Sequence, residues 1–380
     1  MDNPFPLGVA KGEAFCNREA ERMQIKKSIQ HCRHVMLESP RRYGKTSLVQ
    51  KVLEENHIPF EKIDLSLATS AKAVNDYLIS ATERLLIKLQ PSYKKAFELS
   101  KQLLKHLTPK LIIDDIMGAK IELTVSHEKN IVQQIHSTLQ SLDKVAKAAD
   151  RKAVIFIDEF QQIATLTETL EIEAAIRSAA QDFEAITLIF SGSNRRLLQL
   201  MFDDRNRPFF QLCEKIALER ISQTEYEKHL TKLSKKHWKT ALKTEIINMI
   251  LDITERHPYY VNFLCYKLWS LPTSPTDEDI LRTWQLCLEE ETHLLSKDLM
   301  SLTPTQRSIL QLVMTQDVTQ PTSKQVTQSL DYSNRTISKG FEELVAQDYL
   351  YRTDTGTYEL INPLMKTYIR ELLRQKGNHQ

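Results

Sequence analysis

The sequence predicts an α/β fold in which a parallel sheet is flanked by helices and is followed by an all-helical segment and a small C-terminal module. Three observations predict this. Short, fully apolar strands alternate with helices over residues 1–220, which is typical of a parallel sheet covered on both faces. Residues 223–298 have helical periodicity and no strong strand pattern. Near the C-terminus, two strand patterns flank a turn that contains Gly356, which is a hairpin signal.

The elements follow in order along the chain. The expected sheet strands are residues 33–38, 60–65, 153–157, 186–190 and 216–218. Helices are expected over residues 17–30, 47–53, 71–107 (interrupted at Pro91) and 130–149, with a small hairpin over residues 111–113 and 120–125. The C-terminal module is expected to hold helices over residues 304–315, 323–330 and 333–347 and strands over 349–352 and 357–361. Because three helices and a two-stranded ribbon make a winged helix, we expect three domains: an α/β core at 1–220, a helical lid at 221–300 and a winged-helix domain at 301–380.

Composition and charge exclude several classes of protein. The 380 residues include 51 basic and 49 acidic side chains, so the chain has no polybasic or acidic character. No apolar run reaches the ~18 residues that span a bilayer, and the N-terminus has no secretion-signal pattern, so no membrane partner is expected. The five cysteines are scattered and form no Cys/His cluster, which argues against a zinc site or a disulfide framework and favours a cytoplasmic location.

A phosphate-binding loop is predicted at Gly44-Lys45-Thr46, between an expected strand and an expected helix. Backbone N–H groups at a helix N-terminus bind anions. Lys45 would reach the β- and γ-phosphates of a nucleotide, and the Thr46 hydroxyl would bind Mg²⁺. Ser39 stands where the full G-x-x-x-x-G-K-[ST] pattern has its first glycine, so the turn there must not need a glycine conformation. A chance tripeptide is the alternative interpretation, and the strand–loop–helix context argues against it.

A pair of acids, Asp158 and Glu159, follows the apolar strand at residues 154–157. The carboxyl ends of parallel strands lie at the edge of the sheet where ligands bind. Asp158 would hold Mg²⁺, and Glu159 would orient and deprotonate the attacking water. Neighbouring acids also occur as helix caps. The lysine loop upstream makes nucleotide binding the better account.

Polar and basic side chains follow the next strand. Ser193 and Asn194 stand where a polar group would contact the γ-phosphate or the attacking water, so Asn194 is a candidate catalytic residue. The arginines that follow are Arg195, Arg196, Arg205, Arg207 and Arg220. One of them would serve as an arginine finger if the chain forms a homo-oligomer, although a solvated surface position is the simpler interpretation for each one alone.

Four boxes in order along the chain carry a family resemblance. Residues 15–19 resemble an F-x-x-R-E box, residues 39–48 a P-R-R-x-G-K-T-S-L loop, residues 157–161 an I-D-E-F-Q box, and residues 257–261, with a trailing Leu-Trp at 268–269, an H-P-Y-Y box. Together they resemble the AAA+/STAND-type "archaeal ATPase" family of P-loop ATPases, which also occurs in bacteria. The resemblance covers residues 3–270, and a winged helix is a common companion of this core.

The resemblance implies that ATP or ADP lies between the α/β core and the helical lid. It implies nucleotide contacts from the residues Arg41, Arg42, Tyr43, Gly44, Lys45, Thr46, Ser47, Arg18, His257 and Pro258, with residues 4–8 near the adenine. The chain departs from the family pattern at Ser39 and at Arg256, where the H-P box usually has glycine. Arg256 is either a sensor arginine or a surface residue.

We therefore expect a Mg²⁺-dependent ATPase that works as a nucleotide-driven switch. Its partner is open, because residues 301–380 hold nine basic and eight acidic side chains and lack the basic excess of most DNA-binding faces. The winged helix would contact either a protein client or DNA, in the second case through the residues Ser333, Asn334, Arg335, Thr336 and Lys339. The alternatives are a nucleotide-gated module with little turnover and a DNA-binding helper.

Overall fold

The computed structural model describes residues 3–90, 92–104, 107–114, 118–125, 130–353 and 355–377. Pro91, where a helix interruption is expected, lies outside these residues. The contacts divide the chain into two compact units. The α/β unit comprises residues 18–40 and 45–218, and the helical unit comprises residues 1–17, 41–44 and 219–380.

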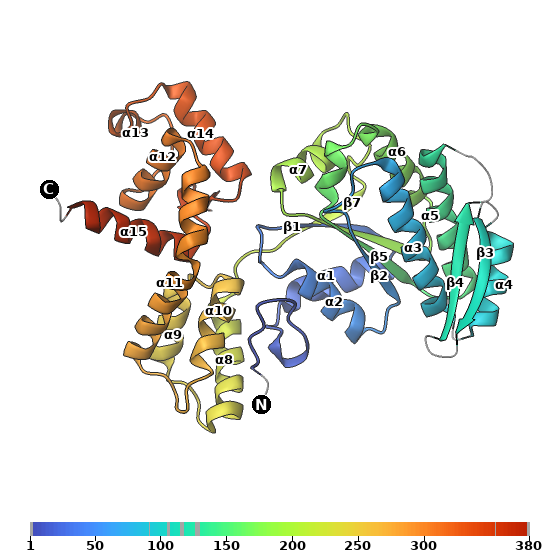
Figure 1. The fold of residues 1–380 in the computed structure, drawn as a ribbon, viewed down its shortest axis with the longest axis horizontal. Helices are drawn as coiled ribbons and strands as arrows, with labels where there is room; N and C mark the ends of the chain where they lie inside the picture. The colour runs from blue at the N-terminus through green and yellow to red at the C-terminus, as the bar shows by residue number, and fades with distance from the viewer. Residues whose placement is uncertain are drawn as a thin grey trace. The chain divides into compact units, whose positions relative to one another are not determined.

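Five parallel strands form the sheet of the α/β unit, in the order β2-β5-β6-β1-β7 (Figure 1). Their bounds are β1 (His34–Glu38), β2 (Phe60–Asp64), β5 (Ala153–Asp158), β6 (Ile186–Ser191) and β7 (Cys213–Ala217). All five strands are expected from the sequence, and only β7 begins earlier than its apolar pattern suggests. The strand order brings the carboxyl ends of β1, β5 and β6 together in the middle of the sheet.

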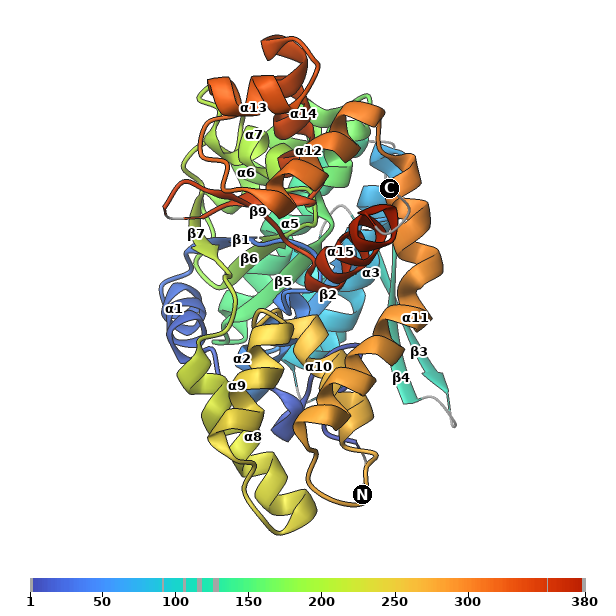
Figure 2. The same cartoon turned by 90° about the vertical axis from the view of Figure 1, so that its left-hand side faces the viewer.

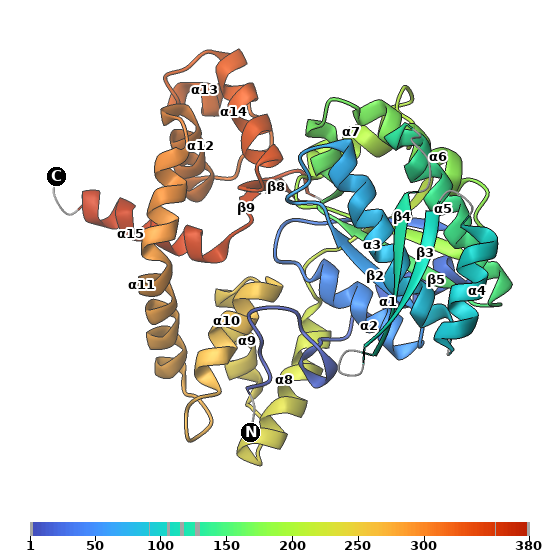
Figure 3. The same ribbon diagram turned by 45° about the vertical axis from the view of Figure 1, so that its right-hand side comes forward.

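Helices cover both faces of this sheet. They are α1 (Glu19–Gln30), α2 (Lys45–Glu55), α3 (Ala71–Leu89), α4 (Tyr93–Leu103), α5 (Ile131–Ala148), the 3₁₀ helix η2 (Phe160–Thr165), α6 (Thr169–Ala180) and α7 (Arg195–Asp203). Successive strand side chains point to opposite faces, so Met36, Ile155 and Phe190 share one large core with α3, α5 and α6. Helices α1 and α2 cover the other face (Figure 1). An antiparallel pair, β3 (Leu107–Asp114) and β4 (Gly118–Val125), lies beside α3 and α4 and is longer than the expected hairpin (Figure 3).

The helical unit contains every element after residue 219. These are α8 (Gln223–Trp238), α9 (Thr244–Ile253), α10 (Pro258–Leu268), α11 (Asp277–Ser301), α12 (Pro304–Thr315), α13 (Lys324–Ser329), α14 (Asn334–Ala346), the antiparallel strands β8 (Leu350–Arg352) and β9 (Tyr358–Leu360), and α15 (Pro363–Gly377). A single hydrophobic core joins them. Phe5, Trp269 and Trp284 are buried in this core, and the third tryptophan of the sequence, Trp238, is partly buried and packs against it.

Helix α11 runs from the helices α8–α10 to the group formed by α12–α15 (Figure 2). It ends at Ser301, next to the domain boundary expected at residue 300, and the three-domain division stays a prediction. Across the described ranges, no helix has the length and apolarity needed to cross a membrane.

Candidate active site

The loop after β1 curls around the side chain of Lys45, the first residue of α2. The Lys45 ammonium donates to the carbonyl oxygens of Ser39 and Pro40, both at 3.2 Å, and lies 3.3 Å from the Ser39 hydroxyl. Lys45 is only 8% exposed. A buried ammonium at a helix N-terminus gives this loop the positive potential that a phosphate group requires.

The backbone of the loop explains its glycine pattern. Gly44 has a φ of +86°, a conformation that favours glycine, and Arg42 has a φ of +65°. Ser39 does not have a positive φ. A serine therefore fits at the position where the full loop pattern has a glycine, as the sequence requires if the loop is to form.

The carboxylate of Asp158, at the end of β5, is held by three side chains. Its Oδ2 atom lies 2.7 Å from the Lys62 ammonium and accepts a hydrogen bond from the Thr46 hydroxyl at 3.2 Å, and its Oδ1 atom accepts one from Ser191 at 2.5 Å. Burial alone would raise the pKa of Asp158, but the hydrogen bonds from Lys62 and Ser191 outweigh it and hold the pKa below its usual value. Asp158 is therefore ionised at neutral pH.

The donor set at this carboxylate fits Mg²⁺. Thr46 and Asp158 supply a hydroxyl and a carboxylate oxygen, the hard ligands that Mg²⁺ takes from proteins in small number, with water and phosphate oxygens completing its shell. In the described part of the chain, no group of three His, Cys, Asp or Glu residues forms a self-sufficient metal site. A metal here would depend on the phosphates of a bound nucleotide.

Glu159 is held in place beside this carboxylate. It has a φ of +53°, which is uncommon for a residue other than glycine. Its Oε2 atom accepts hydrogen bonds from the Ser193 hydroxyl at 2.8 Å and from the Gln161 amide at 2.5 Å. A Cβ atom on Gly192 would lie 1.8 Å from Gln161 Oε1, so only glycine at 192 lets Gln161 reach Glu159 in this way. The result is one carboxylate with a fixed direction at the carboxyl edge of the sheet.

Other predicted residues of the α/β unit have local partners. Asn194 caps α7 by accepting from the Leu197 backbone N–H at 3.1 Å, and it is Ser193 that contacts Glu159. Arg18 forms an ion pair with Glu21 at 2.9 Å. Ser47 is buried in α2, next to Thr46 in the chain.

The arginine-finger candidates differ in their surroundings. Arg207 forms an ion pair with the fully buried Glu173, and Arg195 is half-buried. Arg196 and Arg205 are exposed. The exposed pair is the better placed to reach a neighbouring molecule.

In the helical unit, the residues 41–44 of the phosphate loop lie against the start of α10. The ring of His257, the N-cap of α10, contacts the Tyr43 ring at 4.7 Å between centroids, and the Arg42 guanidinium lies 4.2 Å from the centre of the Tyr259 ring. Pro258 occupies the first turn of α10, and Arg41 is exposed. Burial, with Arg220 and Arg42 nearby, lowers the pKa of His257 to about 3, so this imidazole is neutral.

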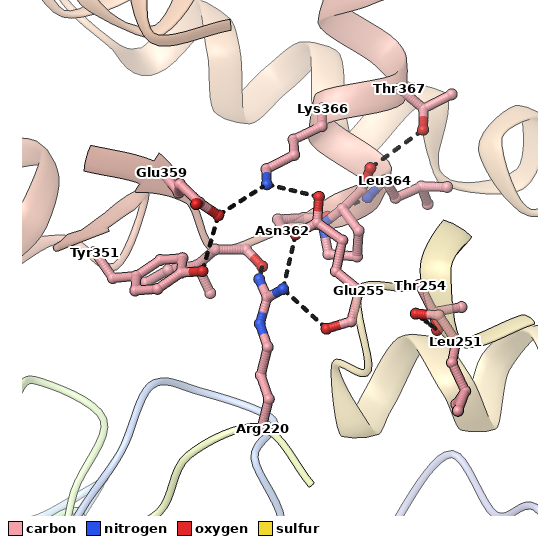
Figure 4. Close-up of polar contacts among 12 residues, drawn as sticks. Arg220, Leu251, Thr254, Glu255, Tyr351, Glu359, Asn362, Leu364, Lys366 and Thr367 are labelled. Carbon is pink, nitrogen blue, oxygen red and sulfur yellow. Dashed lines mark hydrogen bonds and ion pairs between the residues drawn. The ribbon is translucent and has the colours of Figure 1, made fainter. Parts of the chain in front are cut away.

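A charged cluster centred on Glu255, in the turn before His257, joins three parts of the helical unit (Figure 4). Arg220 donates to the carboxylate and to the carbonyl oxygen of Glu255, both at 2.8 Å, and to the carbonyl oxygen of Ile361 at 3.2 Å. Lys366 of α15 donates to the other carboxylate oxygen of Glu255 at 2.6 Å. Glu255 and Arg256 both have a positive φ, so these bonds hold the turn that leads into His257.

Sequence reasoning missed several of these contacts. Ser191 ends the strand next to β5, and Lys62 lies in β2 on its other side, but only the strand order shows that both reach Asp158. Gln161 is the last residue of the I-D-E-F-Q box, but the sequence alone indicates no role for it. The pairing of Arg220 with Glu255 and of Glu255 with Lys366 joins residues that are far apart in the sequence, so no local pattern marks it.

Comparisons with known proteins concern the fold. No protein-family model matches the chain, and no curated protein matches its sequence. Among solved structures, the Walker-type ATPase paby2304 of Pyrococcus abyssi matches with a TM-score of 0.69 and 15% identity over 97% of this chain and 99% of that chain. The Aeropyrum pernix ORC2 protein matches with a TM-score of 0.59 and 10% identity over 99% of this chain and 98% of that chain. The expected fold class is confirmed: the chain has an α/β P-loop fold, in which a five-stranded parallel sheet is flanked by helices, followed by a helical C-terminal part.

Proposed function

We propose that this chain binds and hydrolyses ATP with Mg²⁺ and acts as a nucleotide-driven switch. The observation that carries the proposal is the meeting of Lys45, Thr46, Asp158 and Glu159 at one edge of the sheet. Thr46 and Asp158 are in direct contact although 112 positions separate them. The ORC2 structure is described as ADPNP and ADP complexes, which supports adenine nucleotides as ligands of this fold.

Each residue has a chemical role in this proposal. The Lys45 ammonium exchanges the loop carbonyl oxygens for phosphate oxygens. Thr46 and Asp158 hold Mg²⁺, which would neutralise charge on the phosphates. Glu159 orients the attacking water and accepts its proton, and Gln161 and Ser193 fix the direction of its carboxylate.

The switch would work through the helical unit. Tyr43, at the tip of the phosphate loop, contacts His257, and the turn before His257 is fixed by Arg220 and Glu255. Glu255 is also bound by Lys366, which belongs to α15. A change in the phosphate loop would therefore reach the C-terminal helices through one chain of contacts.

Release of phosphate tests the enzymatic part of the proposal. With saturating Mg·ATP, the wild-type chain should release phosphate steadily, and Glu159→Gln should stop release while retaining nucleotide binding. Glu171→Gln, an exposed residue at the start of α6, is the matched control and should behave like the wild type. Nucleotide binding without any phosphate release by the wild type would favour the alternative of a nucleotide-gated module with little turnover.

The partner of the switch is a separate part of the proposal. The elements α12–α14 with β8 and β9 fit a winged helix, and residues 331–336 at the start of α14 are all exposed. That exposure favours a contact by this helix with DNA or with a protein client. A gel shift at low salt that is lost in Arg335→Ala would support DNA, and no shift at low salt would leave the protein client. A cytoplasmic location and a homo-oligomer with Arg196 or Arg205 as its finger complete the proposal.

A further inference from the structure

The ammonium of Lys62 is bound to the Asp158 carboxylate oxygen that a metal at this site would need as a ligand. Its ammonium lies 2.7 Å from Asp158 Oδ2, the same atom that accepts the hydrogen bond from Thr46. The two residues come from neighbouring strands, because in the β2–β5 register Lys62 pairs with Phe156 and Asp64 pairs with Asp158. The side chains of Lys62 and Asp158 therefore lie on the same face of the sheet, and the long Lys62 side chain reaches along this face to the Asp158 carboxylate.

The surroundings of Lys62 allow its ammonium to move away from the Asp158 carboxylate. Its side chain is 28% exposed, whereas the Asp158 side chain is 10% exposed. The Asp64 carboxylate lies 4.0 Å from the Lys62 ammonium and offers a second, more exposed acid at the rim. A lysine that can move between two neighbouring acids can give up the inner one without losing all compensation for its charge.

We propose that Lys62 is a positioning residue that holds Asp158 in the metal-free protein and competes with a divalent cation for its Oδ2 atom. This inference rests on the proposed function. Because like charges repel, the ammonium weakens binding of a bare cation at Thr46 and Asp158. A cation that arrives with a triphosphate carries compensating negative charge, so Lys62 makes metal binding depend on nucleotide binding.

Binding of Mn²⁺, a spectroscopic substitute for Mg²⁺, measures this competition directly through the loss of the free-ion signal in electron paramagnetic resonance. Lys62→Met keeps an unbranched side chain of similar length and removes the ammonium, which lies 5.7 Å from the centre of the Phe156 ring as well as beside Asp158. Without nucleotide, this variant should bind Mn²⁺ about tenfold more tightly than the wild type, since hydrogen bonds to charged groups are the stronger ones. Lys62→Arg keeps the charge and should bind Mn²⁺ like the wild type, and Asp158→Asn should remove the gain when combined with Lys62→Met.

Repeating the titration with a non-hydrolysable ATP analogue distinguishes the possible failures. The gain from Lys62→Met should shrink when the analogue is bound. Equal or weaker Mn²⁺ binding by Lys62→Met in both titrations, with analogue binding intact, would overturn this inference alone. If the wild type binds no analogue at all, the proposed function fails and this inference fails with it. Lys62→Gln replaces Lys62→Met if circular dichroism shows that the methionine variant is unfolded.

Discussion

Replacing Arg220 by methionine should destabilise the helical unit measurably. The change keeps most of the apolar volume of a side chain that is only 15% exposed, and it removes three hydrogen bonds to Glu255 and Ile361. Hydrogen bonds that involve charged groups contribute about 1.5–3 kcal/mol each when well buried. Three such bonds would sum to about 4.5–9 kcal/mol. The side chains of Arg220 and Glu255 are 15% and 24% exposed, so water replaces part of this loss, and Lys366 still compensates the Glu255 carboxylate. We therefore expect a net loss of about 2–3 kcal/mol of unfolding free energy.

Tryptophan fluorescence makes this change easy to follow. All three tryptophans belong to the helical unit, so their emission during urea unfolding reports on this unit. With a slope of about 2–3 kcal/mol per molar urea, Arg220→Met should lower the midpoint by about 1 M. Arg282→Met is the control, because Arg282 is 68% exposed and its ion pair is with Asp279 on its own helix, so its midpoint should equal that of the wild type. Equal midpoints for Arg220→Met and Arg282→Met would refute the role given to the cluster.

Three further predictions concern single side chains. Burial raises the pKa of Glu173 to about 7 despite its pairing with Arg207, so the α/β unit should lose about 3 kcal/mol of stability as pH rises from 4.5 to 7. Urea unfolding followed by circular dichroism should show that Glu173→Gln lacks this loss, and a pH profile identical to that of the wild type would contradict the prediction. Gly192→Ala should push Gln161 away from Glu159, the proposed general base, and lower kcat about 10- to 100-fold with nucleotide affinity nearly unchanged. An unaltered kcat would argue against this role of Gly192. His257 has a pKa of about 3 in the folded protein, so the stability of the helical unit should be complete above pH 6.5 and fall by about 2 kcal/mol at pH 5, where the unfolded chain binds a proton at this residue. Urea unfolding followed by tryptophan emission should show that His257→Phe lacks this acid sensitivity, and equal sensitivity of the two proteins would argue against the prediction.

Much of the fold could be predicted because its signals are local. The apolar runs of β1, β5 and β6 are each complete in five or six residues, and the glycine and lysine of the phosphate loop stand next to each other. The meeting of Thr46 with Asp158 follows from the rule that ligands bind at the carboxyl ends of parallel strands.

The missed features depend on distant pairing. That Lys62 lies beside Asp158 requires the position of β2 next to β5, which no local pattern gives. Helix α11 was expected as part of the helical stretch at residues 223–298, and it ends at Ser301, next to the expected domain boundary. The catalytic role of Asn194 stays a prediction; its side chain caps α7, and the neighbouring Ser193 is bound to Glu159, a contact that the sequence did not indicate.

Direct measurement of nucleotide binding tests the central claim, that Lys45 and its loop hold a triphosphate. Isothermal titration of ATP with Mg²⁺ should show binding to the wild type and an affinity at least about 100-fold lower in Lys45→Ala. The reason is that the Lys45 ammonium is the buried positive charge that the phosphate loop surrounds with the carbonyl oxygens of Ser39 and Pro40. Lys51→Ala, on the same helix and paired with Glu55, is the matched control and should bind ATP like the wild type. Equal ATP affinity in the wild type and Lys45→Ala would contradict the account.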